Sequence, residues 1–122
     1  MITGGIETVL GVTKDPVFGP TVMFGLGGVF VEVLKDVTFR VAPFGPEEAH
    51  RMIDEIRGRA VLDGARGAPP ADIDALANAI SRLSIFAADN SDTIQTIDIN
   101  PFLALPKGAV AVDALIIPSS DK

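Results

Sequence analysis

The sequence predicts an α+β domain in which a largely antiparallel sheet packs against two helices. Runs of alternating apolar and polar residues fill the first third of the chain and return from about residue 96. Between them lie two segments whose apolar residues recur at helical spacing. Because strands and helices come in blocks and do not alternate strictly, an antiparallel sheet is favoured over a parallel βαβ arrangement.

The composition narrows the classes of protein and of partner. With 122 residues, 48% of them hydrophobic, residues 1–122 suffice for a single packed domain. A net charge of −6 argues against a nucleic-acid partner, which requires a basic surface. The absence of cysteine excludes disulfides, zinc–thiolate sites and thiol catalysis. Since no apolar run approaches about 18 residues and no signal-peptide pattern opens the chain, we expect a cytoplasmic protein without a membrane partner.

Alternation predicts a meander of about four strands in the first third of the chain. In the first strand, Ile6, Leu10 and Val12 fall on one side. A turn containing proline and glycine follows at residues 15–20. The four predicted strands are Ile6–Lys14, Thr21–Phe24, Val29–Leu34 and Val37–Ala42.

Two helices are predicted in the middle of the chain. Pro46 opens the first helix, because proline suits the first turn, and Gly58 ends it. Residues 59–68 are rich in arginine and glycine and predict an irregular connector. The second helix is predicted from Pro69-Pro70 to about Ala88. The inward faces are expected to consist of Ala49, Met52, Ile53 and Ile56 in the first helix, and of Ile73, Leu76, Ala77, Ile80, Leu83 and Ala87 in the second.

Two apolar runs near the C-terminus predict a hairpin with polar groups on one face. In residues 96–102 the alternation places Asp98 and Asn100 together on the polar face. A turn is predicted at residues 105–108, and the run after it delivers Asp113. If the two runs pair, Asn100 and Asp113 meet near the open end of the hairpin.

A few oxygen ligands at this point suit Mg²⁺, which takes one or two carboxylates, keeps several waters and binds phosphate oxygens. A bound Mg²⁺ also reconciles acidic side chains with an anionic nucleotide. On spacing alone, the alternative interpretation is that these acids are caps or solvated strand ends.

The segment Gly25-Leu26-Gly27-Gly28 is a second candidate, because glycines let a backbone approach phosphate oxygens closely. It is not the phosphate-binding loop that requires a following helix and a Lys-Ser or Lys-Thr pair. The alternative is a flexible hairpin turn or a bulge.

Other polar residues have simpler interpretations. His50, the only histidine, is a candidate base, but it lies beside an apolar helix face and fits a boundary position. Arg51 and its neighbouring arginines have acids three or four positions away, which predicts ion pairs within the helix. Arg40 ends an apolar strand and is the more interesting cation, although arginines are common at strand ends.

Two long motifs resemble the ATP-grasp region of NDP-forming acyl-CoA synthetases, a group that includes the ADP-forming acetyl-CoA synthetases. The first is the run from Gly11 to Arg40 (GVTKDPVFGPTVMFGLGGVFVEVLKDVTFR). The second, Ile97–Phe102 (IDINPF), is similar to the Asp/Glu-Ile-Asn-Pro-Leu motif that this group shares with the succinyl-CoA synthetase β subunit. The resemblance extends from Ile6 to Ile117.

The resemblance implies a role for each candidate residue. Asn100 and Asp113 correspond to the pair that holds the Mg²⁺ of a bound ATP or ADP, and Asp98 to a supporting or water-mediated ligand. Phe102 replaces the usual leucine, a change of packing. The nucleotide-binding candidates are Gly25, Gly27, Gly28 and Arg40. No residue is assigned as catalytic.

The resemblance further implies a second, C-terminal half of an ATP-grasp fold. The parent reaction is acyl-CoA + phosphate + ADP ⇌ acid + CoA + ATP through a phosphohistidine. The expected partners are the first ATP-grasp subdomain and the CoA-binding and CoA-ligase domains or subunit, without which this chain is expected to be inactive. Alternatives are a non-catalytic ATP-grasp remnant and a protein-interaction module.

The missing half leads to two structural expectations, and the residues at the C-terminus lead to a third. The first strand would be an exposed edge. A homodimer through that edge or through helix faces would cover bared apolar surface. Residues 118–122 are expected to form a frayed tail.

Overall fold

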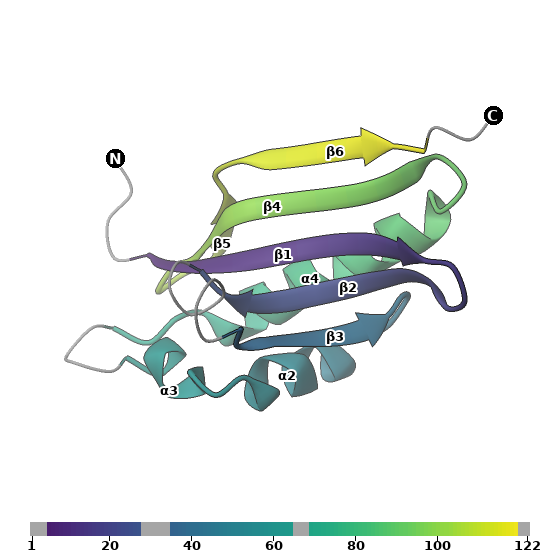
Figure 1. Cartoon of the computed structure of the whole chain (residues 1–122). Coiled ribbons are helices and arrows are strands. Elements are labelled where there is room, and N and C mark those ends of the chain that lie inside the picture. Colours follow the sequence, from purple (N-terminus) through teal and green to yellow (C-terminus); the bar gives the residue numbers. More distant parts are fainter. Residues whose placement is uncertain (1–4, 28–34, 65–68, 120–122) are drawn as a thin grey trace.

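The computed structural model describes residues 5–27, 35–64 and 69–119, which form a sheet with helices on one face (Figure 1). The sheet has six strands in the order β3-β2-β1-β4-β5, and β6 also pairs with β4. All the described pairings are antiparallel, which confirms the predicted α+β class. The predicted strand Val29–Leu34 lies outside the described residues. No helix within the described part of the chain has the length and apolar character to cross a membrane.

The strand β1 (Ile6–Asp15) lies inside the sheet, so the expectation that it is an exposed edge is wrong. It pairs with β2 (Gly19–Leu26) on one side and with β4 (Ile94–Ala104) on the other. The reason is that the C-terminal part of the chain returns to cover it. The outer described strands are β3 (Val37–Val41) at one end of the sheet and β5 and β6 at the other.

Two short strands share the free side of β4. The strand β5 (Ala109–Ala111) pairs with its end, and β6 (Ala114–Pro118) pairs with its beginning. The tail was therefore predicted to begin too early, because Pro118 pairs with Ile94 and the Ser119 N–H donates to the Thr93 carbonyl. Residues 120–122 are not among the described residues.

The helices follow the predicted faces with shifted ends. The helix α2 (Pro46–Glu55) buries Ala49, Met52 and Ile53 as predicted. A short helix, α3 (Arg59–Leu62), stands where a wholly irregular connector was predicted. The guanidinium of Arg59, at its start, bridges Asp54 before the helix and Asp63 after it. The helix α4 (Ile73–Asp89) packs along α2 and under the sheet.

The core lies between the sheet and the helices. Alternate residues of β1 and β2 point toward the helices, and the apolar faces of α2 and α4 meet them. The fully buried side chains include Leu10, Val22, Phe24, Leu26, Met52, Ile53, Leu76 and Ile80. On the other face, which we call the open face, none of the described helices covers the sheet (Figure 1).

The N-terminus of α4 is fastened to the β4–β5 turn by Asp72. Its carboxylate accepts hydrogen bonds from the Gly108 N–H at 2.8 Å and from the Ala75 N–H at 3.1 Å. These bonds, that from Gly108 first, hold the pKa of Asp72 below its ordinary value. Because Asp72 caps the helix, α4 begins at Ile73 and not at the prolines.

We expect Asp72→Asn to lower the melting temperature at neutral pH, since an amide can replace only one of the two acceptors. A lowered folded-state pKa stabilises the fold above the unfolded-state pKa, and this contribution disappears as the pH falls through the folded-state value. The gap between wild type and variant should therefore narrow below about pH 4. Melting curves from pH 7 to pH 3 measure it, with Asp92→Asn, an exposed turn residue, as the control. A gap that stays constant with pH would contradict this role.

Candidate functional site

Asn100 and Asp113 are brought together at a bend in β4. The Asn100 N–H donates to the Asp113 carbonyl at 3.1 Å, and the Val112 N–H donates to the Pro101 carbonyl at the same distance. Asp113 occupies the short link between β5 and β6, so both strands hold it against β4. The predicted meeting of Asn100 and Asp113 is thus confirmed at the level of the backbone.

A β-bulge produces this bend. Along β1 and β4, Thr8 lies opposite Phe102 and Leu10 lies opposite Ile99, so Asn100 and Pro101 together face a single residue of β1. A bulge of this kind reverses which face later side chains occupy. This explains why Phe102 is buried although Asn100, two residues earlier, is exposed.

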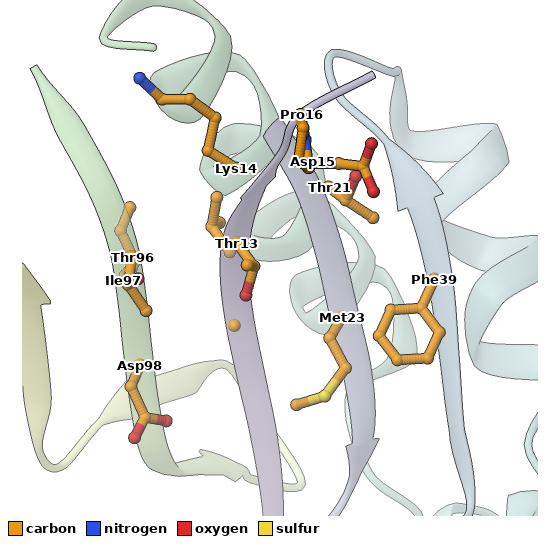
Figure 2. A pocket seen from close by; sticks show the side chains of 12 residues that line it. Thr13, Lys14, Asp15, Pro16, Thr21, Met23, Phe39, Thr96, Ile97 and Asp98 are labelled. Atoms are coloured by element: carbon orange, nitrogen blue, oxygen red, sulfur yellow. The ribbon is translucent and has the colours of Figure 1, made fainter. Parts of the chain in front are cut away.

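Asp98 lies on the open face and lines a groove of about 530 Å³ beside this bend. Figure 2 shows its carboxylate on β4 across from Met23 on β2 and Phe39 on β3. The floor between them is Gly11, which is paired with both Asp98 and Met23. Asp98 and Asn100 are two residues apart on β4, which puts their Cα atoms roughly 7 Å apart. The supporting or water-mediated role of Asp98 stays a prediction.

A row of threonines completes the groove and was missed in the sequence. Thr21, Thr13 and Thr96 are paired neighbours on three adjacent strands, and all three line the groove. The signal was present in the alternation Gly11-x-Thr13 and Thr96-x-Asp98. This row becomes visible only once the strand register is known, because residues 96–98 lie more than 80 positions after residues 11–13 in the chain.

The glycine segment reaches the same end of the sheet as Asn100. Gly25 is paired with Val9 of β1, and Val9 faces the bulge of β4 on its other side. Two strand spacings separate Gly25 from Asn100, which is roughly 10 Å. The Gly27 N–H donates to the Glu7 carbonyl at 2.8 Å, whereas Gly28 lies outside the described residues. Gly25 and Gly27 therefore lie near the bend, Gly25 within β2 and Gly27 directly after the end of that strand.

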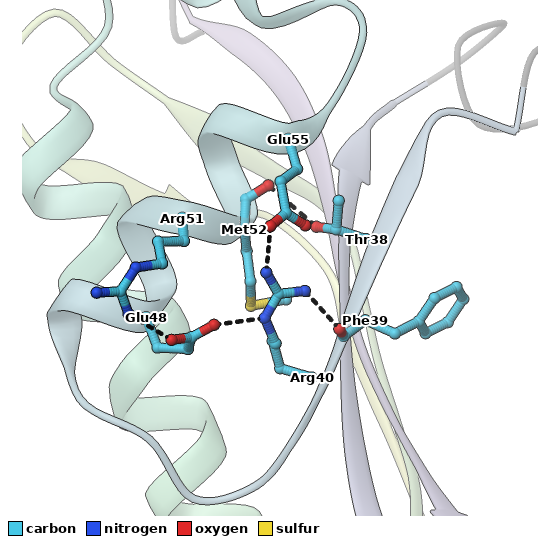
Figure 3. A network of polar contacts seen from close by, with 7 residues as sticks. All are labelled: Thr38, Phe39, Arg40, Glu48, Arg51, Met52 and Glu55. Atoms are coloured by element: carbon cyan, nitrogen blue, oxygen red, sulfur yellow. Dashed lines mark hydrogen bonds and ion pairs between the residues drawn. The ribbon is translucent and has the colours of Figure 1, made fainter.

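Arg40 is not brought to this group of residues. It lies on β3, and its guanidinium forms ion pairs with Glu48 and Glu55 of α2 (Figure 3). The hydrogen bonds that it donates to these two carboxylates, that to Glu55 first, raise the pKa of Arg40 above its ordinary value. Its described contacts fasten β3 to α2, and a role at the nucleotide stays a prediction.

The remaining polar candidates have local partners. The His50 Nε2 lies 3.2 Å from the Asp74 carboxylate on α4, an acid partner that the sequence did not reveal. Arg51 pairs with Glu48 within α2, as predicted. Among the described residues, no group of three or more histidines or acids is placed to hold a metal ion. The bend offers a smaller set, one amide and one carboxylate with Asp98 nearby.

This donor set fits a hard cation. Amide and carboxylate oxygens are ligands that Mg²⁺ accepts, and it needs only one or two carboxylates because waters and phosphates complete its octahedron. Neither sulfur nor imidazole lies in the group, so the set does not favour zinc or copper.

The family model for the ATP-grasp domain matches residues 1–117. The chain therefore belongs to the ATP-grasp family, and its resemblance to the ATP-grasp region of NDP-forming acyl-CoA synthetases is confirmed. It is 49% identical over 119 residues to the acetate–CoA ligase [ADP-forming] II subunit beta of Pyrococcus furiosus, covering 96% of this chain and 50% of that protein. The corresponding ligase I subunit beta of the same organism is 50% identical over 117 residues, with the same coverage.

Solved structures agree. The acetyl-coenzyme A synthetase 1 of Ca. Korarchaeum cryptofilum, in complex with coenzyme A and Mg-AMPPCP, matches with a TM-score of 0.89 and 48% identity, over 94% of this chain and 54% of that one. Its apo form matches with a TM-score of 0.93 and 46% identity, over 98% and 56% of the two chains. This chain thus spans about half the length of each of these relatives.

Proposed function

We propose that this chain is the portion of an NDP-forming acyl-CoA synthetase that holds Mg²⁺ and the phosphates of ATP or ADP. The observation that carries the proposal is the meeting of Asn100 and Asp113 at the bend of β4. Its support from outside the chain is a relative that is 48% identical and was solved with Mg-AMPPCP. The parent reaction would be acyl-CoA + phosphate + ADP ⇌ acid + CoA + ATP.

In this proposal Asn100 and Asp113 would be the protein ligands of the ion. When bound, Mg²⁺ neutralises charge on the phosphate oxygens during phosphoryl transfer. Asp98 would accept hydrogen bonds from waters of the ion and hold them in place. Because β5 and β6 both fix Asp113 against β4, the two ligands keep their positions without a large rearrangement.

The glycine segment would form the phosphate side of the same site. Gly25 lies roughly 10 Å from Asn100 on the same part of the sheet, so the phosphates of a nucleotide whose Mg²⁺ is held at Asn100 would extend toward the glycine segment. Arg40 supports this part of the sheet from the helix side through its pairs with α2. The remaining length of the relatives would supply the first ATP-grasp subdomain and the CoA-binding portions, without which we expect no turnover.

Titration calorimetry of Mg-ADP and Mg-ATP into this chain tests the proposal. We expect weak binding, with a Kd of about 0.1 to 1 mM, because one subdomain forms only one wall of a nucleotide site. Binding should require Mg²⁺ and should disappear in Asp113→Ala, while the exposed turn variant Asp92→Ala should bind as wild type does. Absence of heat at millimolar nucleotide would instead favour a non-catalytic remnant or a protein-interaction module.

A further inference from the structure

The helix α4 presents an exposed stripe on the side away from the core. Six residues of this helix are exposed, and the five of them from residue 78 onward recur at helical spacing, so they share one face. We call this face the α4 stripe. It consists of Asn78, Arg82, Ile85, Phe86 and Asp89.

The centre of the α4 stripe is apolar. Ile85 is 46% exposed and Phe86 is 44% exposed, side by side on a helix whose opposite face already fills the core. The solvent face of such a helix is ordinarily polar. Two adjacent large apolar residues there indicate a surface that another molecule covers.

Opposite charges flank this centre. Arg82 lies one turn before Phe86, and Asp89 lies about one turn after Ile85. Neither forms an ion pair within the described part of the chain, whereas Arg40, Arg51 and Arg59 all do. Asp89 is also the last residue of the helix, where a negative charge is unfavourable to the helix dipole. Helix stability therefore does not explain its position.

The order of these groups is self-complementary. When two copies of the stripe run antiparallel about a two-fold axis between positions 85 and 86, Arg82 of each copy faces Asp89 of the other. The same axis places Ile85 of each copy against Phe86 of the other. Residues related in this way define an isologous interface, in which one surface patch serves both subunits.

We propose that the α4 stripe is a homodimer interface that pairs two copies of this chain through antiparallel α4 helices. The interface lies on the helix side of the sheet and leaves the open face, with Asp98 and its groove, uncovered. One helix face is small compared with stable interfaces, so we expect a weak dimer with a Kd on the order of 10 to 100 µM.

Charge exchange tests the pairing by sedimentation velocity from 5 to 500 µM. Arg82→Glu and Asp89→Arg should each weaken self-association at least about tenfold, because each places two like-charge pairs across the interface. An equimolar mixture of the two variants should associate as wild type does, since both pairs are then attractive. Phe86→Glu should abolish the dimer, and circular dichroism should show that each variant is folded, as expected at exposed positions.

The net charge of the chain supplies the control. Lys107→Glu changes the charge as Arg82→Glu does, at an exposed turn, and should leave association unchanged. Asp89→Arg reduces the net negative charge, so a non-specific charge effect would strengthen association where the proposal predicts weakening. A wild-type chain that is monomeric at 500 µM, or a mixture that associates no better than each variant alone, would overturn the proposal.

Discussion

Asp113→Ala is expected to lower ATP formation at least about 100-fold when this chain works with the remainder of the enzyme. Under the proposed metal role, removal of the carboxylate would leave Asn100 without its partner ligand, and charge on the phosphates would be poorly neutralised during transfer. A chimera provides the assay, because this chain aligns with 119 residues of the Pyrococcus furiosus subunit beta at 49% identity. In it, the chain replaces the matching segment, and ATP formation from acetyl-CoA, ADP and phosphate is measured.

The interpretation of the Asp113→Ala result depends on comparison with two further variants. Asp92→Ala, which removes an exposed acid from a turn, should keep the activity of the parent chimera. Asp113→Asn keeps one oxygen and should fall between wild type and alanine, with partial recovery at high Mg²⁺. If the chimera is active and Asp113→Ala is equally active, the assignment of Asp113 as a metal ligand is wrong.

The sequence predicted the polar face of β4 better than the topology around it. Asp98 and Asn100 were placed on one polar face by alternation, a local property that the strand preserves. The role of β1 was mispredicted because its second neighbour, β4, lies about 90 residues away in the chain. Pairing over such a distance leaves no mark in the local pattern of either strand.

Two shorter elements and the groove were not predicted from the sequence, for other reasons. The strand β6 has no alternation, since all its residues are exposed, and only its pairing with β4 defines it. The four-residue helix α3 carries ion pairs of Arg59 with residues on both sides, which helix propensity does not capture. The groove beside Asp98 depends on the register of four strands, so its threonines could be identified only in the structure.

The glycine motif has a structural explanation that the sequence could not distinguish from phosphate binding. A Cβ at Gly25 would lie 2.7 Å from the Val37 Cγ1 and 2.8 Å from the Asp36 carbonyl oxygen. The Asp36 backbone has little freedom to retreat, because its buried carboxylate accepts the Arg57 N–H at 2.6 Å and the Gly58 N–H at 2.7 Å. Gly25 thus lets β2 approach the segment that anchors the end of α2.

We therefore expect Gly25→Val to destabilise the fold by about 3 kcal/mol, at the upper end for overpacking, because backbone must move. Gly11→Ala is the matched control, since Gly11 lies on the neighbouring strand and a Cβ there would make ordinary contacts of 3.5 Å or more. Urea unfolding measures both. A large loss for Gly25→Val with Gly11→Ala near wild type makes close packing of β2 and β3 a sufficient reason for this glycine. Equal stability of both variants would show that the fold tolerates a side chain at position 25. The close approach of a bound phosphate would then be the remaining explanation for this glycine.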